Sequence, residues 1–345
     1  MSDRSANTPR IAVTMGDPAG IGPEIVMKAV ERLRPRIERG KLSVRVVGAA
    51  RCFEMYSRSL ELPWHIPAVD EPSDTGAIEL VSIGAGETPP APGRVSADAG
   101  RLAYQAIERA VGLCLNGQAD AIVTSPLNKE GLNLAGHHYG GHTELLADLT
   151  GSRDSFMMLA HGAMRVSHLT THIPLQEVTA RLTPERLRRI IELTIETLER
   201  LGIASPRIGI AALNPHAGDG GIFGRQDIDV SAPVIRSFRS EGHDVQGPVP
   251  GDTVFVKLRA GQYDAVVAMY HDQGHIPVKL MGFAIDPETG AYQSVSGVNI
   301  TLGLPIVRTS VDHGTAFDIA GKGVANADSM IEAIDFAIDL SVRRA

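Results

Sequence analysis

The sequence is poor in cysteine, in long apolar runs and in net positive charge, and each shortage excludes a class of protein. Its two cysteines, Cys52 and Cys114, are too few for a disulfide framework or a cysteine-based zinc cluster, and they favour a reducing compartment. No apolar run approaches the ~20 residues of a membrane span, and the first ten residues lack the apolar core of a signal peptide. The net charge of −7 argues against a nucleic-acid or anionic-membrane surface, because both require a dense cationic patch. We therefore predict a cytoplasmic protein that binds neither nucleic acid nor membrane.

What the sequence does contain is a chain of 345 residues that is 43% hydrophobic, enough for a large core and for two domains. Short apolar runs predict strands, and amphipathic segments between several of them predict helices. The predicted strands are 11–15, 43–48, 77–83, 119–124, 156–159, 165–169, 207–213 and 265–269. Three helices are predicted. The first follows Pro23, the second runs from a cap at Asp98 to residue 116, and the third runs from Pro184 to residue 201. This alternation predicts an α/β protein with a mainly parallel sheet.

Histidines follow three of the predicted strands closely, namely His172, His216 and His271. The carboxyl ends of parallel strands meet at one edge of a sheet, where open α/β sheets bind their ligands. Three imidazoles at such an edge resemble a divalent-metal site with an open coordination position. The alternative is that these histidines only hold loops together by hydrogen bonds, since their separations fit no local metal motif.

Other polar segments also follow apolar runs. The glycines of residues 16–24 would let the backbone approach a ligand closely, although a plain strand-to-helix turn also explains them. His142 and Thr143 stand at a predicted helix start, where backbone N–H groups can bind an anion. Residues 297–326 are so rich in glycine and polar groups that we predict a loop around a ligand. A last helix is expected from a cap at Asp328 or Ser329 to Leu340.

Six motifs, in order along essentially the whole chain, carry a resemblance to one family. They lie at residues 16–24, 141–144, 171–175, 213–218, 270–274 and 308–316. In these motifs the sequence resembles the 4-hydroxythreonine-4-phosphate dehydrogenase (PdxA) family of vitamin B6 (pyridoxine) biosynthesis. The resemblance implies a two-domain fold similar to isocitrate and isopropylmalate dehydrogenases, with an active-site cleft between the domains of a homodimer. We expect a cofactor domain of residues 1–125 and 281–345, and a metal, substrate and dimerisation domain of residues 126–280.

The resemblance also implies roles for individual residues. The implied metal ligands, one of them supplied by the neighbouring subunit, are His172, His216 and His271. The implied substrate-binding residues are His142, Thr143, Lys279, Asn299 and Arg308. The implied cofactor-binding residues are Gly16, Asp17, His313, Gly314, Thr315, Ala316, Asp318 and Asn326. The expected catalytic residues are Lys279, Asp272 and His142.

The implied reaction is the NAD- or NADP-linked oxidation of the C3 hydroxyl of a phosphorylated small molecule, a 4-phosphorylated four-carbon hydroxy acid, followed by decarboxylation. A divalent ion at the substrate hydroxyl would stabilise its alkoxide. Zinc, cobalt, nickel, manganese and magnesium all stay open as that ion, because imidazoles accept several metals alike.

Two departures from the vitamin B6 enzymes bear on the substrate. His275 stands in a Gly-His-Ile-Pro-Val-Lys segment where those enzymes usually have Gly-Leu-Pro-Val-Leu-Lys, and residues 284–296 are an insertion. The first variant resembles the paralogous branch that acts on 4-phospho-D-threonate or D-erythronate. Neither departure supplies an obvious carboxylate dedicated to a substrate ammonium, so we favour the hydroxy acid.

Three alternatives stay open at this stage. The first is the vitamin B6 enzyme itself, acting on 4-hydroxythreonine 4-phosphate. The second is a metal-dependent hydrolase that uses the three-histidine ion to activate water. The third is a ligand-binding protein without turnover.

Overall fold

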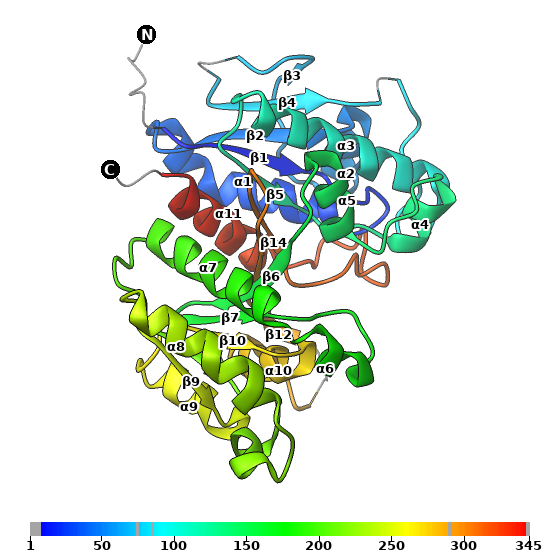
Figure 1. Cartoon of the computed structure of the whole chain (residues 1–345). Helices are drawn as coiled ribbons and strands as arrows, with labels where there is room; N and C mark the ends of the chain where they lie inside the picture. The colour runs from blue at the N-terminus through cyan, green and yellow to red at the C-terminus, as the bar shows by residue number, and fades with distance from the viewer. Residues whose placement is uncertain (1–7, 74–75, 85, 289–291, 343–345) are drawn as a thin grey trace. The chain divides into compact units, whose positions relative to one another are not determined.

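The computed structural model describes residues 8–73, 76–84, 86–288 and 292–342. These residues form two compact units, the first of residues 8–154 and 304–342, and the second of residues 155–303 (Figure 1). The units change over after Asp154 and Gly303, whereas the predicted domains change over after residues 125 and 280. The division into a cofactor domain and a metal domain stays a prediction.

The first unit is built on parallel strands in the order β3, β4, β2, β1, β5, β14. Their bounds are β1 (Arg10–Thr14), β2 (Ser43–Gly48), β3 (Ala68–Val69), β4 (Ile78–Ser82), β5 (Ala121–Thr124) and β14 (Val307–Val311). The helices of this unit are α1 (Gly22–Glu38), α2 (Ala50–Leu60), α3 (Ala97–Leu115), α4 (Lys129–Leu134), α5 (His142–Thr150) and α11 (Asp328–Ser341).

Helices cover both faces of this sheet, which explains why its inner strands are nearly continuous in apolar residues. Ile122 of β5 packs into a core shared with α3 and α5. On β14, the hydroxyl of Thr309 donates to the Ala333 carbonyl of α11 at 2.7 Å. Successive side chains of a strand point to opposite faces, and Arg308 pairs in register with Ile122. Arg308 is therefore directed to the face that α3 and α5 cover.

The second unit contains strands in the order β13, β6, β7, β10, β8, β9. Their bounds are β6 (Phe156–His161), β7 (Met164–His168), β8 (Ile208–Ala211), β9 (Val245–Val249), β10 (Ala265–Ala268) and β13 (Val298–Leu302). Strands β7, β10, β8 and β9 run parallel, and β6 is antiparallel to both of its neighbours. The longer helices are α7 (Pro184–Arg200), α8 (Ala232–Ser240), α9 (Gly251–Arg259) and α10 (His271–Gly282).

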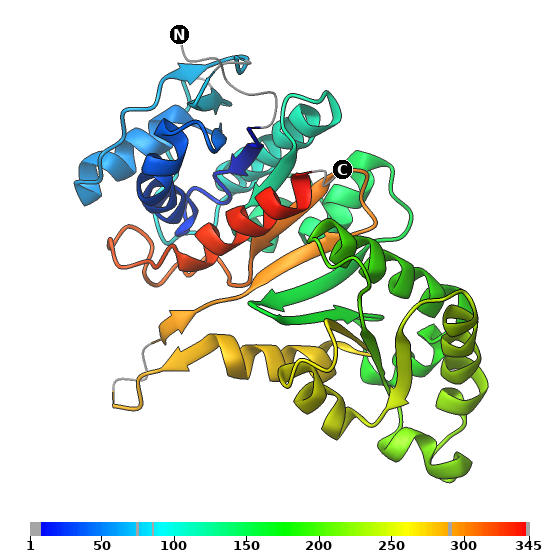
Figure 2. The same ribbon diagram turned by 90° about the vertical axis from the view of Figure 1, so that its left-hand side faces the viewer.

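The remaining elements of this unit are short (Figure 2). They are η1 (Leu175–Glu177), α6 (Val178–Arg181), η2 (Pro215–Gly221), the π-helical η3 (Asp227–Ser231), and the hairpin strands β11 (Phe283–Ile285) and β12 (Tyr292–Val295). The predicted insertion at residues 284–296 thus falls on this antiparallel hairpin, apart from residues 289–291, which lie outside the described residues. Within the part of the chain that the structure describes, no helix has the length and apolar character of a membrane span.

The predicted α/β class with a mainly parallel sheet is confirmed. The prediction of a continuous loop over residues 297–326 is wrong, because β13 and β14 are largely buried strands within it. Their partner strands satisfy the backbone, so polar residues such as Asn299 and Arg308 can stand in a sheet. The loop begins only after β14, at Asp312.

Two local predictions also need correction. Ser96, not Asp98, caps α3, with its hydroxyl accepting from the N–H of Ala99 at 3.2 Å. Neither Asp328 nor Ser329 caps α11; the side chain of Asn326 accepts from the N–H of Asp328 at 2.7 Å instead. The residues after β10 begin helix α10 at once, with Tyr270 as its N-cap, so His271 lies in a first helical turn.

Two glycines of α3 give a matched test of the packing in the first unit. A Cβ on Gly100 would overlap the backbone of Gly131 in α4, whereas a Cβ on Gly112 would meet nothing within 4 Å. We expect Gly100→Ala to destabilise the protein by about 1–3 kcal/mol because it overpacks the helix contact. Gly112→Ala should stabilise it by up to ~1 kcal/mol through helix propensity. Thermal unfolding of both variants checks this, and equal melting temperatures would contradict the close approach of α3 and α4.

Candidate functional site

Three predicted metal histidines follow neighbouring strands of the second unit. His172 comes after β7, His271 after β10 and His216 after β8, and these strands stand side by side and parallel in the order β7, β10, β8. The ring centroids of His172 and His271 are 5.7 Å apart. Two imidazoles are therefore neighbours at one edge of this sheet.

His271 is oriented by the residue that follows it. Its Nδ1 lies 2.7 Å from a carboxylate oxygen of Asp272, which can only accept when ionised. This contact places the ring proton on Nδ1 and leaves the lone pair on Nε2. Histidines that bind metals commonly have such a carboxylate partner, so the side chain has the form of a metal ligand. Asp272, predicted as catalytic, thus lies in position to orient His271.

His216 lies in a different setting. It is exposed at the start of η2 and begins six successive residues with positive φ, from 51° at His216 to 102° at Gly221. Among the described residues, no group of three or more His, Cys, Asp or Glu side chains is arranged to hold a metal ion. One chain thus brings His172 and His271 close without a third ligand, and the metal role of the three histidines stays a prediction.

A buried imidazole pair lies beside His271. His168, the last residue of β7, is 1% exposed, and His275 of α10 is 6% exposed. His275 Nδ1 lies 3.1 Å from His168 Nε2, and the ring of His275 stacks on that of His271 with centroids 3.6 Å apart. Burial lowers the pKa of His275 to about 4, and burial together with neighbouring His275 lowers the pKa of His168, so both rings are neutral near pH 7. Sequence reasoning missed His168, although a histidine on the same face as apolar Val166 was a signal.

The two other predicted residues of this unit sit on α10 and β13. Lys279 is partly buried near the end of α10, with Nζ 5.1 Å from the ring centroid of Phe283. Because His271, His275 and Lys279 follow one another at intervals of four, they line one side of the helix. Oδ1 of Asn299 is buried on β13 and has no hydrogen-bond partner among the described residues.

In the first unit, a buried cation lies near a neutral histidine. Arg308 is 2% exposed, and its Nη2 donates to the hydroxyl of Thr124 at 2.7 Å. Burial lowers the pKa of Arg308 to about 9, and burial together with the Arg308 charge holds the pKa of His142 well below its usual range. Nε2 of His142 is buried without a partner among the described residues, at the first turn of α5, where Thr143 follows. A cation, a neutral imidazole and a helix start together favour an anionic ligand.

The first predicted cofactor segment is a tight turn after β1. Gly16 has φ +70°, and a Cβ there would overlap the carbonyl of Pro126, so the turn requires glycine. The adjoining Asp17 is fully buried. Its Oδ1 accepts from the N–H of Ala19 at 2.8 Å, while Oδ2 has no partner within the described part of the chain. Burial raises the pKa of Asp17 to about 6.

The second predicted cofactor segment packs on this turn. The N–H of Ile21 donates to the carbonyl of Thr315 at 3.0 Å, and a Cβ on Gly20 would stand 2.8 Å from the same oxygen. The fold therefore brings together two segments, 16–24 and 313–326, that are far apart in the sequence. In the second segment Gly314, Asp318 and Asn326 are exposed, and Ala316 has φ 43°. His313 is partly buried, with its pKa lowered by burial.

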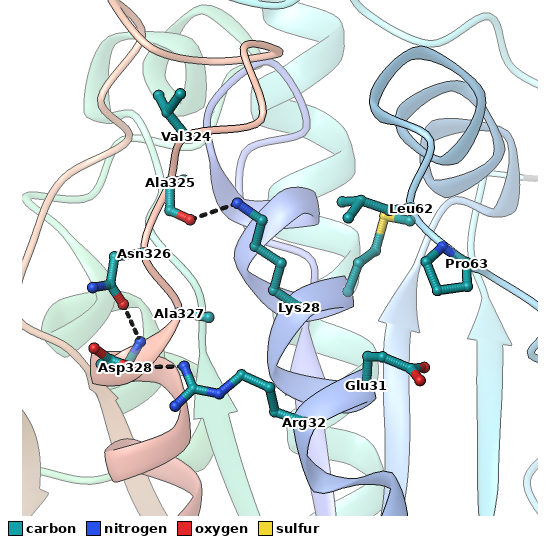
Figure 3. Close-up of a pocket in the computed structure, with 11 residues that line it drawn as sticks. Lys28, Glu31, Arg32, Leu62, Pro63, Val324, Ala325, Asn326, Ala327 and Asp328 are labelled. Carbon is teal, nitrogen blue, oxygen red and sulfur yellow. Dashed lines mark hydrogen bonds and ion pairs between the residues drawn. The ribbon is translucent and has the colours of Figure 1, made fainter.

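A pocket of about 560 Å³ opens beside the end of this segment (Figure 3). Its lining comes from α1, from the residues after α2 and from the residues before α11: Met27, Lys28, Glu31, Arg32, Leu62, Pro63 and residues 324–328. Lys28 binds Glu24 Oε1 at 2.7 Å and the Ala325 carbonyl at 2.8 Å. Arg32 pairs with Asp328 at 2.5 Å. Of the residues that line this pocket, only Asn326 was predicted from the sequence to bind the cofactor.

Comparison with known proteins identifies the family. Residues 41–337 match the family model described as pyridoxal phosphate biosynthetic protein PdxA. The chain belongs to the PdxA family. It is an oxidoreductase that acts on a CH–OH group, because its relatives are named dehydrogenases.

Two relatives and one solved structure show how far the likeness to other PdxA proteins extends. A Bradyrhizobium diazoefficiens protein provisionally named D-threonate 4-phosphate dehydrogenase is 61% identical over 95% of each chain. The 4-hydroxythreonine-4-phosphate dehydrogenase of Beijerinckia indica is 46% identical over 96% of this chain and 95% of its own. A crystal structure of a 4-hydroxythreonine-4-phosphate dehydrogenase from Burkholderia phymatum is 41% identical, covers 97% of this chain and 99% of its own, and has a TM-score of 0.82.

The buried Asp17 carboxyl gives a pH-dependent prediction. Its raised pKa means that the folded protein favours the protonated form, so its contribution to stability is present in acid and is lost as pH rises from about 4 to about 6. Above that window the carboxylate should cost about 3 kcal/mol. We expect Asp17→Asn to melt near the wild-type temperature at pH 4 and clearly above it at pH 7. The control is exposed Asp318→Asn, and a constant Asp17→Asn difference across pH would contradict the prediction.

Proposed function

We propose that this PdxA-family protein oxidises the C3 hydroxyl of 4-phospho-D-threonate or 4-phospho-D-erythronate with a nicotinamide cofactor. When bound, the nicotinamide ring would accept hydride from C3, and loss of the hydroxyl proton would then give a 3-keto acid. The C1–C2 bond then breaks, carbon dioxide leaves, and a proton at C2 completes a three-carbon ketone phosphate. The observation that carries the proposal is the buried Arg308 beside neutral His142, because this pair supports a site for a substrate anion.

The anion site uses residues of the first unit. Arg308 can make two parallel hydrogen bonds to phosphate, a geometry that lysine cannot reproduce. Neutral His142 can donate from Nε2, and the first turn of α5, with Thr143, offers backbone N–H groups. A bound phosphate would offset the cost of burying the Arg308 charge.

Residues of the second unit fit a divalent ion. His172 and His271 are adjacent imidazoles, and Asp272 orients His271 in the manner of a metal ligand. We infer that the third ligand, His216, is supplied by the other subunit, since one chain does not gather all three. When bound, a divalent ion would lower the pKa of the substrate hydroxyl. Lys279 would pair with the C1 carboxylate, and Asn299 would use its buried amide for a substrate oxygen.

The shared metal site requires a homodimer, and α10 carries a surface suited to one. Ile276 and Leu280, four residues apart on this helix, are 58% and 77% exposed. Met281 and Ile285 extend the exposed apolar surface toward the hairpin. An apolar stripe on the helix that begins with His271 supports an interface close to the metal ligands. The cytoplasmic location stays a prediction.

The pocket beside Asn326 is proposed to hold the adenosine part of the cofactor. Met27, Leu62, Pro63 and Val324 offer apolar surface for a base, and Asn326 offers a polar group. The nearby cations already have partners, Lys28 with Glu24 and backbone carbonyls, and Arg32 with Asp328. A 2′-phosphate would have to displace these contacts, so we propose NAD rather than NADP.

A hydroxyl rather than an amine at C2 is favoured by two observations. The Bradyrhizobium relative named for the hydroxy acid is 61% identical, and the Beijerinckia relative named for the amino acid is 46% identical. His275 contacts imidazoles and a backbone carbonyl, and its neutral ring offers no negative charge to a substrate ammonium. The hydrolase alternative is disfavoured because the relatives are named dehydrogenases.

A panel of substrates tests the chemistry. We expect kcat/KM for 4-phospho-D-threonate or 4-phospho-D-erythronate to exceed that for 4-hydroxythreonine 4-phosphate by about tenfold, an effect of ~1.4 kcal/mol. The acids without phosphate should react poorly, because Arg308 and the start of α5 would lose their anion. A preference for the amino substrate would assign the vitamin B6 activity. Equal rates without phosphate would remove the proposed anion site.

The ion pairs between α1 and α11 test the cofactor preference. Asp328→Ala releases Arg32 within the pocket and should increase kcat/KM for NADP relative to NAD by about tenfold, as expected for one new charged contact. The matched control is Asp335→Ala, which releases Arg36 from an ion pair between the same two helices but outside the pocket lining. Unchanged cofactor preference in Asp328→Ala, or an equal change in both variants, would contradict this place for adenosine.

A further inference from the structure

The imidazoles of His168, His275 and His271 form a continuous cluster in the second unit, in which His168 and His275 are buried and His271 is partly exposed. His275 Nδ1 lies 3.0 Å from the backbone carbonyl of His271 and 3.1 Å from His168 Nε2. The ring of His275 lies almost parallel to that of His271, at 12°. Gly274 permits the contact, since a Cβ there would overlap Nε2 of His168. His275 therefore touches both the main chain and the ring of a proposed metal ligand.

The hydrogen bonds fix where the ring protons lie. A backbone carbonyl can only accept, so the proton of His275 is on Nδ1. That N–H also faces His168 Nε2, which must then carry the lone pair. The proton of His168 is left on Nδ1, which lies 3.4 Å from the carbonyl of Met157. The pair is thus satisfied with both rings neutral.

His275 could instead be read as a metal ligand itself. His271 and His275 are four residues apart on a helix, a spacing at which two histidines can bind one ion. Their stacking argues against this reading, because an imidazole binds a metal in its own ring plane. Two nearly parallel rings with centroids 3.6 Å apart share no such plane.

We propose that His275, supported by His168, is a positioning residue that holds the ring plane and the backbone of His271 and so directs its Nε2 toward the metal. The inference rests on the proposed metal site. The hydrogen bond holds the main chain at the first turn of α10, and the stacked ring restricts rotation of the His271 side chain.

The test uses chelator-treated full-length protein titrated with Co²⁺, followed by its visible absorption and its affinity. We expect His275→Leu to weaken Co²⁺ binding by about 10- to 100-fold and to change the spectrum, as for other residues that orient a ligand. His275→Asn should recover most of the affinity, because its side-chain N–H can replace Nδ1–H. In turnover, His275→Leu should lower kcat with little change in KM for the phosphorylated substrate. Wild-type affinity and spectrum in His275→Leu would overturn the proposal.

A double variant separates positioning from packing. His275→Leu alone leaves His168 Nε2 buried without its donor, which destabilises the fold. Combining it with His168→Leu should restore thermal stability but not Co²⁺ affinity. Recovery of both would show that the pair only fills space, and would overturn the positioning role. His271→Ala tests the proposed metal site separately: it should abolish Co²⁺ binding, and unchanged binding would remove that site and the positioning role with it.

Discussion

Parallel pairing is the constraint on which the proposed chemistry of the second unit depends. Strands β7, β10 and β8 are neighbours and run in one direction, so the residues that follow them must emerge at one edge. His172 and His271 are neighbours there. Helix α10 begins at the same edge, and His275 and Lys279 lie on the same side of this helix as His271. The sheet thus determines where the imidazoles lie, and local hydrogen bonds determine how they face. This separation explains how side chains about a hundred positions apart in the sequence come together at one edge of the sheet.

Buried polar atoms without a hydrogen-bond partner in the described part of the chain occur at three of the predicted site residues. Asp17, His142 and Asn299 each have a buried side-chain atom without a partner among the described residues. Such an atom costs about 1–3 kcal/mol, so a ligand that satisfied it would gain affinity at these three positions. Such atoms occur in both units, because Asp17 and His142 belong to the first unit and Asn299 to the second. Each unit therefore contains a buried polar atom that the proposed substrate or cofactor would satisfy.

Much of the fold could be predicted because the apolar runs are unambiguous. The strand predicted at 43–48 coincides with β2, and the predicted helix from Pro184 ends one residue from the observed end of α7. Strands β13 and β14 could not be predicted in this way, because Asn299 and Arg308 give them a loop-like composition and only neighbouring strands satisfy their backbones. His168 was missed for a related reason: its role arises from contact with His275, 107 residues away. The sequence places His172, His216 and His271 after neighbouring strands, but within the part of the chain that the structure describes no three metal-binding side chains are gathered.

The most direct test of the account is the location of a bound metal ion by anomalous diffraction from crystals grown with Co²⁺ or Zn²⁺. The account predicts one ion for each His172 and His271 pair, about 2.0–2.1 Å from both Nε2 atoms for zinc. His216 of the partner subunit should complete the site, while the ring of His275 stays stacked on His271 without touching the ion. An ion bound elsewhere, or His271 directed away from it, would contradict the central claim that this sheet edge is the metal site of the dehydrogenase.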